Sequence, residues 1–207
     1  MKLGLSAHGV TIWRGDRCLA RGLSFELGEG EVLQLVGPNG SGKTSLMRVL
    51  AGIGRLDEGE VRWGGIPIRA CLDYHATLAY LGHSNALKNH LTTRENIYFY
   101  HSITANSSEI TADEILSRLE LKPVADRPCG LLSMGQRRRA ALARLLIGRA
   151  RLWILDEPLS SLDAEGVAQV AALLMEHVRA GGLAVIATHQ VLQLDGVPVR
   201  RLELGGN

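Results

Sequence analysis

The stretch of the chain with the most definite chemistry is GPNGSGKTS, residues 37–45. It fits the pattern G-x-x-x-x-G-K-[ST] and lies between an apolar run at 32–36 and a helix-forming run at 46–50, the strand, loop and helix that this pattern requires. Glycine has no Cβ, so the backbone can adopt positive φ and approach an anion closely. Amides at the start of a helix favour phosphate oxygens. We therefore expect a phosphate-binding loop, rather than a glycine-rich turn before an ordinary helix.

Two side chains in this loop have chemistry of their own. The ammonium of Lys43 supplies a charge for the β- and γ-phosphates of a nucleotide, and the hydroxyl of Thr44 can bind Mg²⁺. The predicted nucleotide-binding residues are Gly37, Pro38, Asn39, Gly40, Ser41, Gly42, Lys43, Thr44 and Ser45.

Two adjacent acids follow a second apolar run, in LWILDEP at 152–158. Asp156 ends that run, so we expect its carboxylate at the carboxyl edge of a sheet, where Mg²⁺ would lie beside Thr44. Glu157 comes next and can polarise an attacking water as a general base. The other interpretation of the pair is an acidic turn that caps a helix. We favour the first, which makes Asp156 a metal ligand and Glu157 a catalytic residue.

The elements that must position these residues include two kinds of strand. Residues 3–13 and 18–27 alternate apolar and polar positions, which predicts antiparallel strands joined by a turn. Short apolar runs predict buried strands, with one more strand closing the chain. These predicted strands cover residues 32–36, 78–81, 152–155, 183–187 and 199–204.

Helical periodicity dominates the segment at about 84–150. Thr92 and Thr111 are each followed three residues later by Glu, the spacing of a capping box, which predicts that a helix starts at each of them. A long helix is expected to end near residue 148. Asp163 is a suitable N-cap for a helix at 164–179.

Composition fits one globular α/β domain over residues 1–207. The chain is 46% hydrophobic and 21% charged, with a net charge of +2, which is too balanced to indicate nucleic acid as the main ligand. We expect a P-loop core with an antiparallel β subdomain and a helical subdomain at about 84–150. The basic run at 137–139 is interpreted as a solvated helix face.

The cysteines and the hydropathy of the sequence indicate the cellular compartment of the protein and whether it spans a membrane. The three cysteines are far apart and form no C-x-x-C pair, which predicts neither a disulfide framework nor a zinc site and fits a reducing cytosol. No apolar stretch approaches the roughly 18 residues of a membrane span. If the protein works at a membrane, we expect another chain to hold it there.

Five motifs occur in a fixed order: GPNGSGKT (37–44), LSMGQ (132–136), LWILDEP (152–158), SSLD (160–163) and a lone His189. In this set the chain resembles, over nearly its whole length, the nucleotide-binding subunits of ABC (ATP-binding cassette) transporters. The LS-x-GQ signature separates that family from other P-loop ATPases. The resemblance implies an ABC-type ATPase fold, a helical subdomain that carries the signature, and hydrolysis of ATP with Mg²⁺.

The resemblance also implies roles for residues outside the P-loop. His189 would contact the γ-phosphate and align the attacking water, as a second catalytic residue. Ser133, Gly135 and Gln136 would bind the ATP of a partner subunit, so the implied active unit is a head-to-tail homodimer around two ATP molecules. Asp163 would touch the partner and couple the two sites. The signature residues could instead simply cap their own helix.

The resemblance also bears on Trp13 and His83. Trp13 occupies the region where the family places an aromatic that stacks on adenine, although a strand aromatic with no ligand is nearly as good an interpretation. His83 matches a position where the family carries a Gln that reaches the Mg²⁺ shell. An imidazole can bind a metal-bound water but is a poor direct ligand for Mg²⁺. We therefore expect the pocket to close differently, or the coupling step to be sensitive to pH.

Finer features indicate a branch of the family. Four short segments resemble the ATP-binding subunits of bacterial cytochrome c biogenesis, often called haem exporters. They are GH at 82–83, LT-x-x-EN at 91–96, YFYH at 98–101 and RRR-x-ALARL at 137–145. This implies membrane partners like CcmB and CcmC, a peripheral position at the cytoplasmic face of the inner membrane, and ATP hydrolysis linked to haem handling.

No haem-ligation motif is visible in the sequence, so haem is assigned to the partners. The alternatives are an ABC transporter with another cargo, or a soluble ABC ATPase that acts on nucleic acid or ribosomes. The latter would need a long coiled-coil insert or a second cassette, and the sequence has neither.

Overall fold

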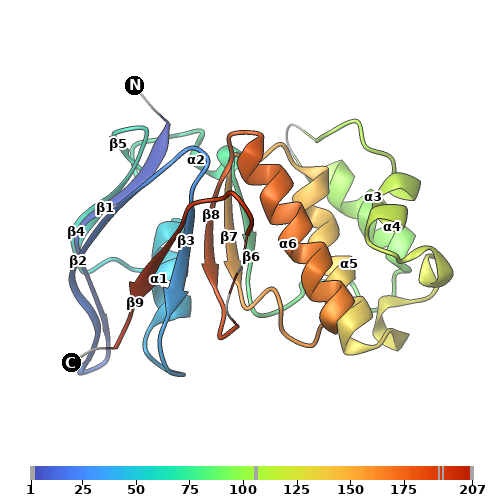
Figure 1. The fold of residues 1–207 in the computed structure, drawn as a ribbon, viewed down its shortest axis with the longest axis horizontal. Coiled ribbons are helices and arrows are strands. Elements are labelled where there is room, and N and C mark those ends of the chain that lie inside the picture. Colours follow the sequence, from blue (N-terminus) through green and yellow to red (C-terminus); the bar gives the residue numbers. More distant parts are fainter. Residues whose placement is uncertain (1–2, 105–106, 191, 193, 206–207) are drawn as a thin grey trace.

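Two β-sheets and the helices between and beside them form the layers of the fold (Figure 1). The computed structural model describes residues 3–104, 107–190, 192 and 194–205. An antiparallel sheet lies on the left in Figure 1, helix α1 lies between it and a parallel sheet, and the remaining long helices cover the far face of the parallel sheet.

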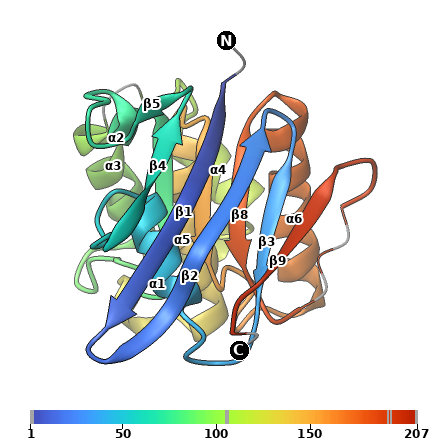
Figure 2. The same ribbon diagram turned by 90° about the vertical axis from the view of Figure 1, so that its left-hand side faces the viewer.

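The antiparallel sheet has the strand order β2-β1-β4-β5, and Figure 2 shows it facing the viewer. Its two long strands, β1 (Gly4–Arg14) and β2 (Arg17–Gly28), match the alternating segments of the sequence to within one residue at each end. The other two are β4 (Glu58–Trp63) and β5 (Ile66–Pro67). β5 was not predicted, because two residues carry no period-2 pattern.

The parallel sheet has the strand order β6-β7-β8-β3-β9, and each neighbouring pair is parallel. The carboxyl ends of its strands therefore meet at one edge of the sheet. The strands are β3 (Val32–Val36), β6 (Leu78–Leu81), β7 (Leu152–Asp156), β8 (Leu183–Ala187) and β9 (Val199–Glu203).

Each central strand of this sheet contributes to two hydrophobic cores, because successive side chains point to opposite faces. On β7, Leu152 and Ile154 pack into the core shared with α1 and the antiparallel sheet, whereas Trp153 and Leu155 pack into the core shared with the other helices. Burial on both faces explains why these strands appear in the sequence as continuous apolar runs.

Helices α3 (Thr93–Ile103), α4 (Ala112–Arg118) and α6 (Ala164–Arg179) begin at the residues that the sequence indicated. Thr92 and Thr111 each accept a hydrogen bond from the backbone amide three residues on, and complete capping boxes start α3 and α4. Asp163 caps α6 by accepting from the Gly166 amide at 2.9 Å. The helices are α1 (Lys43–Leu50), α2 (Tyr74–Thr77), α3 (Thr93–Ile103), α4 (Ala112–Arg118), α5 (Met134–Ile147) and α6 (Ala164–Arg179).

Among the described residues, none of the helices combines the length and the hydrophobicity needed to cross a lipid bilayer.

The side chain of His177, a residue of α6, packs against the parallel sheet, where burial opposes its protonation. The imidazole of His177 stacks on the indole of Trp153, with the ring centroids 3.9 Å apart and the planes 7° from parallel. Its Nε2 lies 3.1 Å from the Leu183 oxygen, and donates to it in the neutral ring. Burial lowers the pKa of His177 to about 4.

We predict that this histidine makes the fold acid-sensitive. The pKa of this histidine in the folded chain lies below its unfolded value of about 6.5, so the unfolded chain binds the proton more tightly than the folded chain does. As the pH falls from 6.5 towards 4, protonation therefore favours unfolding. Unfolding free energies from urea titrations should fall by about 1–2 kcal/mol more between pH 7 and pH 5 in the wild type than in His177→Phe. The exposed His90→Gln should behave like the wild type, and equal pH slopes in all three proteins would contradict the prediction.

Candidate nucleotide-binding and active site

The loop at 37–42 leaves β3 with a backbone that suits close approach to an anion. Gly37, Gly40 and Gly42 have φ values of 146°, 77° and 101°, in the region that favours glycine. Helix α1 begins directly after Gly42, and no side chain caps it. Its first amides thus point out of the helix towards the loop, the arrangement that binds phosphate.

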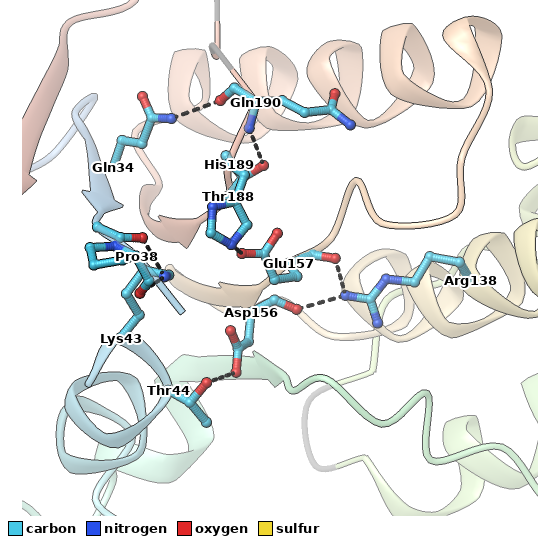
Figure 3. A network of polar contacts seen from close by, with 11 residues as sticks. Gln34, Pro38, Lys43, Thr44, Arg138, Asp156, Glu157, Thr188, His189 and Gln190 are labelled. Atoms are coloured by element: carbon cyan, nitrogen blue, oxygen red, sulfur yellow. Dashed lines mark hydrogen bonds and ion pairs between the residues drawn. The ribbon is translucent and has the colours of Figure 1, made fainter. Parts of the chain in front are cut away.

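Lys43 is held across this loop. Its Nζ donates to the backbone oxygens of Gly37 at 2.7 Å and Pro38 at 3.0 Å. Figure 3 shows Lys43 beside Pro38. The ammonium is therefore positioned by two carbonyls, and it retains a third hydrogen for another acceptor.

Thr44 and Asp156 are brought together although they are 112 positions apart in the chain. The Thr44 hydroxyl donates to Asp156 Oδ2 at 2.8 Å (Figure 3). Thr44 lies in the first turn of α1, and Asp156 is the last residue of β7 and only 2% exposed. The bond confirms that the carboxylate lies at the carboxyl edge of the sheet, next to the phosphate-binding loop.

Glu157 and His189 form the other close pair at this edge. His189 Nε2 lies 3.3 Å from Glu157 Oε1, and the two side chains point towards each other in Figure 3. Glu157 has a φ of 50°, in the left-handed region, and its amide donates to the Ala187 oxygen at 2.9 Å. A residue in that region is strained, and such strain is common at functional sites.

These groups surround a pocket of about 540 Å³, a volume within the range of small-molecule sites. Its described lining residues are Arg14, Arg17, Leu19, Asn39, Gly40, Gly42, Lys43, Thr44, Ser45, His83, Asp156, Glu157, Ser160 and His189. Arg14, Arg17, Leu19 and Ser160 were not predicted. The two arginines come from the β1–β2 hairpin, where no spacing motif marks them.

The other predicted site residues lie elsewhere. Trp13 is 41% exposed and near the guanidinium of Arg21, and it is not among the described residues that line the pocket. The signature residues 133–136 are not among them either. Instead, Ser133 and Gln136 form a capping box at the start of α5. Asp163 is exposed at the start of α6.

The expectation that residues 137–139 form a solvated face is wrong for Arg138. Arg139 forms an ion pair with Glu120 at 3.0 Å near the surface. Arg138, one position earlier, is buried and donates to the backbone oxygens of Asp156 and Glu157. Adjacent positions on a helix point in different directions, so Arg138 is buried while Arg137 and Arg139 are half-buried, and a run of identical residues does not reveal which one faces the core.

Comparison with known proteins identifies the family. The family model described as ABC transporter matches residues 20–160. The chain belongs to the ABC transporter family. It is an ATP-binding ATPase subunit, as the five motifs predicted.

Relatives cover nearly the whole chain. The chain is 40% identical over 202 residues to the cytochrome c biogenesis ATP-binding export protein CcmA of Aliivibrio fischeri, with 97% of this chain and 99% of the relative aligned. It is 43% identical to the protein of the same name in Yersinia pestis (96% and 91% aligned) and 42% identical to that of Shigella flexneri (97% and 96% aligned). The branch predicted from the sequence is thus the branch of these relatives.

Solved structures confirm the predicted ABC-type ATPase fold. A Pyrococcus furiosus protein described as an ATP-binding protein of an ABC transporter superimposes with a TM-score of 0.81 at 22% identity, covering 97% of each chain. The ATP-binding cassette MJ0796, in a dimeric post-hydrolysis state bound to ADP and Pi, gives 0.82 at 22% identity, covering 97% of this chain and 96% of that one.

The donor set at the pocket fits Mg²⁺ with a nucleotide. The described residues contain no cluster of three or more His, Cys, Asp or Glu side chains placed to hold a metal ion. Mg²⁺ does not need one, because it is usually bound by one or two protein oxygens, waters and phosphate oxygens. The carboxylate of Asp156 and the hydroxyl of Thr44 are donors of this type, and they adjoin the phosphate-binding loop.

The loop geometry predicts that its glycines differ in their tolerance of a side chain. A Cβ on Gly37 would lie 2.3 Å from the Leu204 oxygen and 2.8 Å from Ser41 Oγ, whereas the nearest atom to one on Gly40 is Arg17 Nη1 at 3.9 Å. Both residues have positive φ, so both Ala variants carry backbone strain, and only Gly37→Ala adds a clash. Urea unfolding should show Gly37→Ala less stable than Gly40→Ala by about 2 kcal/mol. Equal stabilities would show that the loop shifts freely.

Proposed function

We propose that the chain hydrolyses ATP at this pocket, with Glu157 as general base, in a head-to-tail dimer that energises cytochrome c biogenesis. The observation that carries the proposal is the convergence of four loops at one edge of the parallel sheet. The phosphate-binding loop follows β3, Asp156 ends β7 and Glu157 comes directly after it, and His189 follows β8. His83, after β6, lines the same pocket.

Phosphate binding belongs to the loop and to the start of α1. The first amides of α1 and the ammonium of Lys43 face the position of the β- and γ-phosphates. Thr44 and Asp156 would hold Mg²⁺, which neutralises charge on the phosphate oxygens. Gly37, Gly40 and Gly42 have no Cβ and adopt positive φ, so at these three positions the backbone can approach the phosphates closely. His83 would act through a metal-bound water.

Glu157 and His189 have different roles towards the attacking water. The Glu157 carboxylate accepts a proton from the water as it attacks, and His189, 3.3 Å away, orients the water and contacts the γ-phosphate. The His189 loop is fixed by the Gln190 amide, which donates to Thr188 Oγ1 at 3.2 Å, and by Gln34 Nε2, which donates to the Gln190 oxygen at 3.0 Å. The pair is therefore held before a nucleotide arrives.

A second copy of the chain would complete each site. Ser133, Gly135 and Gln136 start a helix whose N-terminus favours an anion. Ser133 is exposed, and these residues do not line the pocket of their own chain among the residues that the structure describes. A head-to-tail pairing brings the signature of one copy to the nucleotide of the other, and the exposed Asp163 can then contact the partner.

The relatives support the proposed biological role. Three CcmA proteins at 40–43% identity align over almost all of this chain. By that likeness the chain works at the cytoplasmic face of the inner membrane, bound peripherally to membrane subunits like CcmB and CcmC. ATP hydrolysis drives haem handling by those partners, and this chain does not bind haem or nucleic acid.

Glu157→Gln and Lys43→Ala should separate hydrolysis from binding. Both variants should lose ATP turnover in the assembled complex, by at least about 100-fold, because one lacks the base and the other the phosphate-binding charge. Only Glu157→Gln should still trap ATP in a dimer, measured by size-exclusion chromatography with labelled ATP. Undiminished turnover in Glu157→Gln would assign the base to another residue.

The cellular role is tested by complementation. In a bacterium that lacks its own CcmA, the wild-type chain should restore haem-stained c-type cytochromes, and Glu157→Gln should not. Restoration by Glu157→Gln would mean that hydrolysis is not needed. A wild-type chain that is expressed, hydrolyses ATP and yet restores nothing would indicate another cargo.

A further inference from the structure

Arg138 is a buried arginine that joins separate segments at the carboxyl edge of the parallel sheet. It lies in α5 and is 2% exposed. Its guanidinium donates to the backbone oxygens of Asp156 (2.8 Å) and Glu157 (2.9 Å) through Nη2, and to that of Pro158 (3.3 Å) through Nε. Figure 3 shows the first two contacts. Because the group is planar and has five donors, it holds several acceptors in fixed relative positions.

The same guanidinium also reaches the loop after β6. Nη1 donates to the Gly82 oxygen at 3.3 Å and to Asn85 Oδ1 at 2.9 Å. His83 lies between these two residues and lines the nucleotide pocket. One side chain therefore ties helix α5 to the loop that carries His83 and to the turn that carries Glu157.

The turn at Glu157 needs such support. Glu157 has a φ of 50°, and a residue other than glycine stays in this region only where its surroundings hold it. Its amide is held by the Ala187 oxygen at 2.9 Å, and its own oxygen accepts from Arg138 and from the Ser160 amide at 3.1 Å. The direction of the Glu157 carboxylate depends on this backbone conformation, and Arg138 is the contact that comes from α5.

Helix α5 carries the signature at its N-terminus, in the same half of the helix as Arg138. Ser133 is the N-cap, and Arg138 lies five residues further along the same 14-residue helix. A helix that rises about 1.5 Å per residue moves as a unit over this short distance. A displacement of the N-terminus of α5 is thus passed to the guanidinium, and from there to the backbone of Glu157.

We propose that Arg138 is a positioning residue that couples the two nucleotide sites of the dimer. When Ser133 and Gly135 engage the nucleotide of the partner, α5 is fixed, and Arg138 then fixes the turn that aims Glu157 at the nucleotide of its own chain. The inference rests on the function proposed above, in which Glu157 is the base and the signature faces a partner.

Protonation does not govern this contact. Burial lowers the pKa of the Arg138 guanidinium, and the neighbouring carboxylates of Asp156 and Glu157 raise it. An arginine stays charged throughout the working pH range, so its five donors are permanent. The coupling is therefore geometric.

A double-mutant cycle in the full-length chain, assembled in its ATP-hydrolysing complex, tests the proposal. Arg138→Lys keeps the charge but cannot span the five acceptors, so kcat should fall about tenfold, while KM for ATP stays within about threefold because the phosphate-binding loop is untouched. In the Glu157→Gln background, the same substitution should change the residual single-turnover rate by less than about twofold, because Arg138 acts only through Glu157.

Two controls separate positioning from folding. Arg139→Lys, at the next position but paired with Glu120 at the surface, should keep kcat within about twofold. Asn85→Ala removes one acceptor and leaves the guanidinium in place, so kcat should fall about threefold, again only when Glu157 is present. If Arg138→Lys does not fold, the result for Asn85→Ala tests whether the contacts of Arg138 position Glu157.

The outcomes that overturn the inference are distinct from failure of the proposed function. An unchanged kcat in Arg138→Lys and Asn85→Ala, with Glu157→Gln inactive, rejects the positioning role alone. An equal loss in the presence and absence of Glu157 rejects it too, since Arg138 would then act on the fold in general. Full turnover in Glu157→Gln would instead reject the choice of base.

Discussion

Parallel pairing of β8 with both β3 and β7 is the constraint on which the site depends. It aligns the ends of three strands, so the loops that follow them meet although they are far apart in the sequence. The register is strongly specified because each strand faces a different core on each side. A slip of one residue would exchange the side chains of the two cores, moving Trp153 to the face that Leu152 occupies. The chemistry of the edge is therefore maintained by the packing of the sheet.

At the end of β7, a change of backbone conformation gives two adjacent carboxylates different surroundings. Asp156 still belongs to the strand, and its side chain is buried against Thr44. Glu157 turns into the left-handed region, and its carboxylate meets His189. The two acids are therefore positioned in different ways. Asp156 is positioned by the sheet, and Glu157 by the hydrogen bonds of its backbone with Ala187 and Arg138.

The features that were predicted correctly have local signals. Strands β3, β6 and β8 have the predicted bounds because an apolar run starts and stops where the strand does, and the boxes at Thr92 and Thr111 involve residues only three apart. The features that were missed depend on tertiary packing. Which arginine of 137–139 is buried depends on what faces α5, and the presence of Arg17 in the pocket depends on how the β1–β2 hairpin is placed over the loop.

Two hydroxyls for which we propose ligand contacts, those of Ser133 and Thr44, already have hydrogen-bond partners within the chain. Ser133 Oγ accepts from the Gln136 amide at 3.2 Å, so the signature does cap its own helix. A hydroxyl that accepts one bond still has its hydrogen to donate, which is what an anion requires. Thr44 is the reverse case: it donates its hydrogen to Asp156, and the lone pairs of its oxygen are what a metal ion requires. The structural and the proposed ligand-binding roles of these residues are therefore compatible, because each hydrogen bond leaves free the part of the hydroxyl that the proposed ligand needs.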